Sequence, residues 1–208
     1  MEILIDGHGT ELAGKSNTFE EVFDRITKHC ARERRVVTQV ALDGEVLPTL
    51  DQSSLASISI SGVEKVEATT ASIAEVSTDV LKKCADAIPR MIEGFYASAD
   101  QIQSGNTQQG FEAIGQLVGF WGDIVGGVGS GLIGAELDLS TVTVEVGEAG
   151  DTEQLNGQEI LTRINSLLEE TQRAFEDSDT VEIADIVGYD LPVLVRGFQQ
   201  SLYKLLET

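Results

Sequence analysis

The sequence is poor in basic residues. It has 14 lysines and arginines against 35 aspartates and glutamates in 208 residues, a formal net charge of −21. Nucleic-acid phosphates are bound by clusters of Lys and Arg, so this charge excludes a nucleic-acid-binding protein and disfavours anionic membrane surfaces. The shortage is greatest from Met91 to Thr162, where there is no Lys or Arg. The pattern predicts either a docking face for a basic or amphipathic protein, a solvated surface, or adaptation to a salty cytoplasm.

Histidine and cysteine are scarce as well, with two of each in the whole chain. His8, His29, Cys30 and Cys84 follow no metal-ligand spacing and contain no CxxC pair, so we expect neither a zinc site nor a disulfide framework. The sequence has no arrangement typical of nucleophilic catalysis, and we expect no enzyme and no cofactor. The N-terminus lacks the basic and apolar regions of a signal peptide, which predicts a cytoplasmic protein.

The hydrophobic content of 41% is enough for a folded core, and the hydrophobic period changes near residue 70. Residues 1–69 predict a β-grasp-like (ubiquitin-like) module. Thr18-Phe19-Glu20-Glu21 has the form of a capping box at the start of its helix. Asp43-Gly44 is a hairpin turn signal. The expected elements are a strand at 2–5, a short return strand at 10–13, a helix at 19–33, a hairpin over 36–47, and an antiparallel strand pair over 55–60 and 63–68.

Residues 70–208 show helical spacing and predict a four-helix bundle, so the fold class is α+β. The segments 70–128 and 158–205 resemble each other, each a helix, a connector and a helix. Two such hairpins together bury faces that neither buries alone. Kinks are expected at Pro89 and Pro192 because proline removes a helix hydrogen bond. Glycines at 126–134 are expected to end the second helix. The stretch at about 126–156 is then a Gly-rich, acidic insert that holds one strand at 141–146 and a loop at 147–156.

One motif suggests an enzyme. Gly9, Gly14, Lys15 and Ser16 match the P-loop pattern, in which backbone amides cradle phosphates, the lysine reaches the terminal phosphates and the serine holds magnesium. The predicted antiparallel turns and a helix start at Thr18 fit poorly with the parallel sheet of a P-loop NTPase. Nucleotide binding therefore stands as an alternative function.

The glycine-rich region raises a second alternative. Residues 113–135 contain one charge, Asp123, and repeated small-xxx-small spacing over a length that could span a membrane. The competing interpretation is a bundle helix whose glycines permit close packing. Gly129-x-Gly131-x-x-Gly134 matches a dinucleotide-binding pattern, but a helix precedes it and a strand follows, the reverse of what that site needs.

Three aromatic residues are the candidate partner-binding side chains: Trp121, Phe120 and Tyr189. Aromatic side chains in such helices usually pack in the core. Where they are exposed instead, they are typical anchors of protein interfaces.

The stretch Asp177-Ser178-Asp179-Thr180-Val181-Glu182-Ile183-Ala184-Asp185-Ile186-Val187-Gly188-Tyr189-Asp190-Leu191-Pro192 resembles a family of uncharacterised bacterial proteins. In that family a polar connector precedes an apolar-Ala-Asp core and an aromatic-acidic-Leu-Pro step. The resemblance implies a β-grasp-like start, a helical remainder and an association with flagellar genes, and it implies no catalytic residues. We therefore expect a non-enzymatic cytoplasmic adaptor or chaperone-like protein, linked to flagellar assembly, whose oligomeric state stays open.

Overall fold

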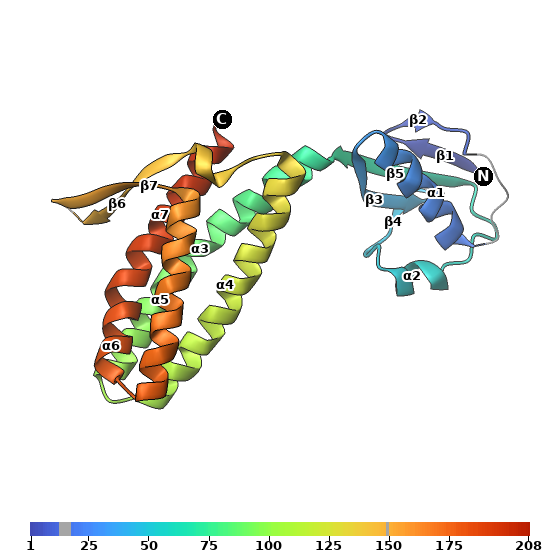
Figure 1. Ribbon diagram of the computed structural model, residues 1–208. Helices are drawn as coiled ribbons and strands as arrows, with labels where there is room; N and C mark the ends of the chain where they lie inside the picture. Colours follow the sequence, from blue (N-terminus) through green and yellow to red (C-terminus); the bar gives the residue numbers. More distant parts are fainter. Residues whose placement is uncertain (13–17, 149) are drawn as a thin grey trace. The chain divides into compact units, whose positions relative to one another are not determined.

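The computed structural model describes residues 1–12, 18–148 and 150–208. The chain divides into two compact units, Met1–Val76 and Ser77–Thr208. The first is built on a mixed sheet and the second is mainly helical (Figure 1), which confirms the predicted α+β class.

The first unit has a five-stranded sheet in the order β2-β1-β5-β3-β4. The first and last strands pair in parallel at its centre, and the other neighbours are antiparallel. This order, with one long helix between the two hairpins, is the β-grasp topology. The elements are β1 (Glu2–Ile5), β2 (His8–Gly9), α1 (Phe19–Arg32), β3 (Arg35–Leu42), β4 (Glu45–Val46), α2 (Gln52–Ser57) and β5 (Lys65–Ser72).

Helix α1 begins where the sequence predicts. The Thr18 hydroxyl oxygen accepts a hydrogen bond from the Glu21 N–H at 3.3 Å, which satisfies one donor of the first turn. One face of the helix is buried, with side chains three or four residues apart that join the same core as the sheet residues Val40 and Val66. The buried residues of this face are Phe19, Val22, Ile26 and Cys30.

The predicted strand pair over 55–60 and 63–68 is wrong. Residues 52–57 form the short helix α2, which the Asp51 carboxylate caps by accepting from the Ser54 N–H at 3.0 Å. Alternating Leu and Ser indicated a strand, but the Asp51 cap and the burial of Leu55 stabilise a short helix here instead. The last strand instead starts at Lys65, and it pairs with both β1 and β3.

The return strand is also displaced. It is β2, at His8–Gly9, where Gly9 pairs with Leu4 and His8 with Ile5. The structure therefore places it just before the predicted 10–13, of which residue 13 lies outside the described residues.

The second unit is a four-helix bundle with a β-hairpin attached (Figure 1). Its core draws side chains from all four long helices and from the hairpin. Edge-to-face ring pairs join α4 to both later helices, as Trp121 with Phe198 at 5.4 Å between ring centroids and Phe111 with Phe175 at 4.4 Å. The elements are α3 (Ile73–Gln103), α4 (Thr107–Ala135), β6 (Thr143–Glu148), β7 (Asp151–Asn156), α5 (Gly157–Asp177), α6 (Thr180–Asp185) and α7 (Leu191–Leu206).

Helix α4 does not end at its glycines, so the irregular insert predicted at 126–156 is wrong. The helix runs to Ala135. Strand β6 (Thr143–Glu148) largely confirms the strand predicted at 141–146, whereas β7 (Asp151–Asn156) pairs with it where a loop was predicted. Tertiary packing overrides the low helix propensity of glycine here. A Cβ at Gly131 would lie 2.7 Å from Leu81 Cγ, and one at Gly127 would lie 2.8 Å from Cys84 Sγ. These positions are glycine because α3 lies against them.

The last helical segment is interrupted rather than simply kinked. A π-helical turn, Ile186–Asp190, joins α6 to α7, and Pro192 stands in the first turn of α7. Pro192 has no N–H to donate back along the helix. In the first turn of a helix this costs little, because the N–H groups of that turn have no acceptor within the helix. Pro89 does not end α3, which continues on both sides of it.

The glycines of α4 allow a matched test of this packing. We expect Gly131→Ala to lower the free energy of unfolding by about 1–2 kcal/mol, because overpacking against buried Leu81 exceeds the gain in helix propensity. Gly122→Ala should instead raise it by about 0.5–1 kcal/mol, because nothing lies within 4 Å of a Cβ at Gly122. Urea unfolding followed by the emission of Trp121, the one tryptophan, measures both. Equal effects of the two substitutions would contradict the α3–α4 contact.

Candidate functional site

A groove runs along the helical unit between the β6–β7 hairpin, α5 and the start of α7. Its volume is about 700 Å³, within the range of ligand-binding clefts. We call it the hairpin groove. Its apolar wall is formed by Val146, Leu155, Leu167, Val193 and Leu194. Its polar rim is formed by Asp151, Glu153, Arg163, Tyr189 and Asp190.

The hairpin is held in place by α7. A Cβ at Gly197 would lie 2.6 Å from Val146 Cγ2, so only glycine lets β6 come this close to the helix. The Lys204 ammonium donates a hydrogen bond to the Thr143 carbonyl oxygen at 2.8 Å at the base of the hairpin. Val144 and Val146, two residues apart on the strand, are both buried against the bundle. The β6–β7 hairpin, which forms one side of the groove and which we call its roof, is therefore packed firmly on the bundle.

The π-helical turn borders the groove through Tyr189 and Asp190. Gly188 in this turn lies against α3, where an added Cβ would be 3.0 Å from Ala99 Cβ. The two residues that follow turn outward, and Tyr189 is 62% exposed. Single π turns inside helices often occur at functional sites because they displace side chains from the regular helical face.

A second cavity of about 290 Å³ adjoins the groove and shares Gly147, Tyr189 and Val193 with it. Its wall includes Tyr96 and Arg196, and the Arg196 guanidinium donates to the Tyr96 hydroxyl oxygen at 3.4 Å. The hairpin groove therefore continues past Tyr189, and the tyrosine ring stands between two hollows.

The two ends of the polar rim differ in charge pairing. The Arg163 guanidinium donates to both carboxylate oxygens of Glu153, at 2.6 and 2.9 Å, and this lowers the pKa of Glu153. Asp190 is in the opposite situation. Although Asp190 is exposed, desolvation by the surrounding protein raises the pKa of its carboxyl group, and the like charges of Asp185 and Glu170 raise it further. Within the described part of the chain, no Lys or Arg forms an ion pair with Asp190.

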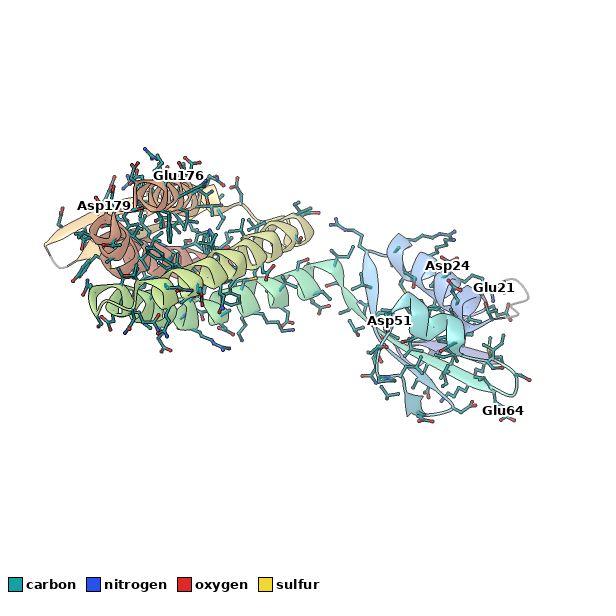
Figure 2. All side chains as sticks on the ribbon, turned by 90° about the horizontal axis from the view of Figure 1, so that it is seen from below. Glu21, Asp24, Asp51, Glu64, Glu176 and Asp179 are labelled. Carbon is teal, nitrogen blue, oxygen red and sulfur yellow. The ribbon has the colours of Figure 1, made fainter. Side chains whose placement is uncertain are left out.

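Other acidic residues near this region have structural roles. Figure 2 shows Glu176 and Asp179 at the turn between α5 and α6. The Asp179 carboxylate accepts from the N–H groups of Val181 and Glu182, at 3.1 and 3.0 Å, and so caps α6. The acidic connector thus starts a helix. No group of three or more His, Cys, Asp or Glu side chains able to hold a metal lies among the residues described.

The three aromatic residues predicted to bind a partner lie in three different environments. Trp121 is 3% exposed and packs on Phe198, so it offers a partner no surface. Phe120 is half-buried and lines a separate cavity of about 460 Å³ between α3 and α4. Tyr189 alone of the three lies in the hairpin groove. The sequence did not predict Asp190 as a site residue, and it did not predict the β6–β7 hairpin. The available signal for Asp190 was the Tyr189-Asp190-Leu191-Pro192 step, on which the family resemblance rests.

The P-loop residues are only partly described. Gly14, Lys15 and Ser16 lie outside the described residues, and Gly9 lies in β2. Strand β1 leads into an antiparallel strand, whereas a P-loop leads from its strand directly into a helix. Helix α1 starts at Phe19 with Thr18 as its own cap.

Among the described residues, one helix is long and apolar enough to cross a membrane by length and composition, and it is α4. Its most apolar window has a mean hydropathy of 1.3, and 22% of that window is buried. One side of α4 packs on α3 through Gly127 and Gly131, and the other side is open around Gly122. A bundle helix of a soluble protein can pass the same test.

The comparisons with known proteins agree with the division of the chain into two units, Met1–Val76 and Ser77–Thr208. The profile of a family described as a domain of unknown function, DUF8042, matches residues 79–201. The chain belongs to the DUF8042 family. The TP0873 N-terminal domain profile matches residues 1–72. No curated protein and no solved structure matches the chain. The DUF8042 match contains every residue of the hairpin groove, so the groove belongs to the domain that defines the family.

The raised pKa of Asp190 leads to a stability prediction for this DUF8042 protein. The folded state disfavours the charged carboxylate, so at pH 7 the residue costs stability, and this cost disappears as pH falls below the ordinary carboxyl pKa. We expect Asp190→Asn to raise the free energy of unfolding at pH 7 by at most about 0.5 kcal/mol, and to change nothing at low pH. Urea titrations at both pH values measure this. A less stable variant at pH 7 would show that the carboxylate makes a stabilising contact.

Proposed function

We propose that this protein is a non-enzymatic adaptor or chaperone-like protein that binds another protein in the hairpin groove. The observation that carries the proposal is the exposed Tyr189 ring, which lines both the hairpin groove with its apolar wall and the more polar second cavity. Exposed tyrosines beside apolar depressions are typical anchors of protein interfaces, because they bury a large area and keep a hydroxyl group for hydrogen bonding. The rest of the groove supplies shape and charge for the same partner.

The charge of the chain supports a basic or amphipathic partner. The net charge is −21, and the stretch from Met91 to Thr162, which includes α4 and the hairpin, has no basic residue. Such a surface speeds the approach of a positively charged protein, and this attraction weakens as salt shortens the Debye length. Acidic groups at the rim also disfavour acidic competitors.

The setting follows from the resemblance described above. The stretch Asp177–Pro192, which resembles bacterial proteins associated with flagellar genes, forms α6, the π-helical turn and the first turn of α7. The same stretch supplies Tyr189 and Asp190 to the groove. We therefore propose a cytoplasmic role in flagellar assembly, in which the segment that carries the resemblance also contacts the partner.

Site-specific crosslinking tests this function. A photoreactive phenylalanine analogue replaces Tyr189 in one variant and Ile133 in a control, since Ile133 is 81% exposed on α4 and does not line the groove. We expect the Tyr189 position to form a discrete adduct with another polypeptide. The yield should fall as salt approaches about 1 M, where the Debye length is about 3 Å.

Two results would contradict the proposal. Adducts of equal yield from both positions would mean that contacts are not specific to the groove. An adduct at Tyr189 whose yield ignores salt would mean that the acidic surface takes no part in binding.

A further inference from the structure

Two carboxylates that line the groove, Asp151 and Asp190, form no ion pair within the described residues. Glu153 and Arg163 neutralise each other across the rim. Asp190 lies opposite, on the π-helical turn, and the charged groups that act on it are the carboxylates of Asp185 and Glu170. Beside it stand the exposed Tyr189 ring and the apolar side chains of Val193 and Leu194. Of the two carboxylates without an ion pair, Asp190 is the one next to Val193 and Leu194 of the apolar wall, and this combination is a specific chemical feature.

We infer that the hairpin groove takes a segment of the partner protein in which a lysine or arginine pairs with Asp190 and a neighbouring aliphatic side chain packs on Val193 and Leu194. This inference rests on the proposed function and names the partner segment that the groove selects. The cation supplies the counterion that none of the described residues provides, and the aliphatic side chain covers the apolar wall.

The geometry favours a peptide over a small ligand or a metal ion. The groove continues past Tyr189 into the second cavity, so there is room for more than one side chain. In the described ranges, Asp190 belongs to no group of three potential metal ligands. Asp185 and Glu170 act on Asp190 as like charges, which favours an incoming ammonium or guanidinium group.

Charge pairing at Asp190 also fits the energetics of the fold. Desolvation by the surrounding protein and the neighbouring acids raise the pKa of Asp190, so the carboxylate is held at a cost that a bound cation removes. Residues kept at a cost to stability are typical of binding sites. The combination of a more stable fold and weaker binding is therefore the expected signature of Asp190→Asn.

Defined peptides test the inference on the full chain. Fluorescence anisotropy is measured with three labelled, acetylated peptides of equal length: alternating leucine and lysine, leucine and glutamine, and leucine and glutamate. We expect the lysine peptide to bind most tightly and the glutamate peptide least. Asp190→Asn should weaken the lysine peptide by about threefold to tenfold and leave the glutamine peptide nearly unchanged. Asp190→Glu should retain part of the affinity.

Asp123→Asn is the matched control. It removes the same charge from the open side of α4, outside the groove, and should change the affinity for the lysine peptide by less than about twofold. Equal losses from Asp123→Asn and Asp190→Asn would overturn the inference, because bulk attraction would then explain the binding. So would a glutamate peptide that binds as well as the lysine peptide, or no detectable binding of the lysine peptide.

The two proposals fail in different ways. If Tyr189 crosslinks a partner but Asp190→Asn leaves the lysine peptide unaffected, the inference is wrong and the adaptor function stands. If the lysine peptide does not bind and Tyr189 forms no adduct, both are wrong. Urea unfolding of the Asp190→Asn variant shows that any loss of binding is not a loss of fold.

Discussion

The helical unit depends on glycines against which the side chains of a neighbouring element pack directly, in space that a Cβ would otherwise occupy. At Gly131 the helix α4 lies against Leu81 of α3, and at Gly197 the helix α7 lies against Val146 of β6. The first contact holds the early helical hairpin together, and the second seats the β-hairpin on the bundle. Because interiors pack at crystal-like density, neither contact can relax without exposing apolar surface. The hairpin groove exists because the second contact fixes its roof.

The groove combines two properties that are usually in conflict. Its apolar wall favours burial, whereas its rim carries acidic groups that resist it. The charge of Glu153 is neutralised by its ion pair with Arg163. Asp190 forms no such ion pair with any described residue, and nearby acids raise its pKa. In a protein with a net charge of −21, the acidic residues are not all equivalent: Asp51 and Asp179 cap helices, and Asp190 faces a cavity.

The elements that were predicted correctly are those whose signals are local. The Thr18 cap and the spacing from Phe19 to Cys30 placed α1, and Asp43-Gly44 placed the β3–β4 turn. The errors came where a contact distant in sequence decides the outcome. Gly127 and Gly131 looked like a helix end because glycine propensity is a local property, while the packing of α3 against them is not. The Leu-Ser alternation around Leu55 looked like a strand for a similar reason, since the local pattern does not show that Leu55 is buried in the core while Ile58 and Ile60 are only partly buried against it.

The sequence by itself determined the α+β class, the change of hydrophobic period near residue 70 and the shortage of basic residues. It also singled out Asp177–Pro192 as the stretch that carries the family resemblance. These follow from composition and from periodicity within single elements. Only the tertiary structure decided that Trp121 is buried while Tyr189 is exposed, and that β6–β7 folds back to form a groove with Asp190 on its rim. The physical reason is that exposure and cavity shape depend on which elements pack together. A π-helical turn and a glycine contact at Gly197 set that packing, and neither has a periodic signature in the chain.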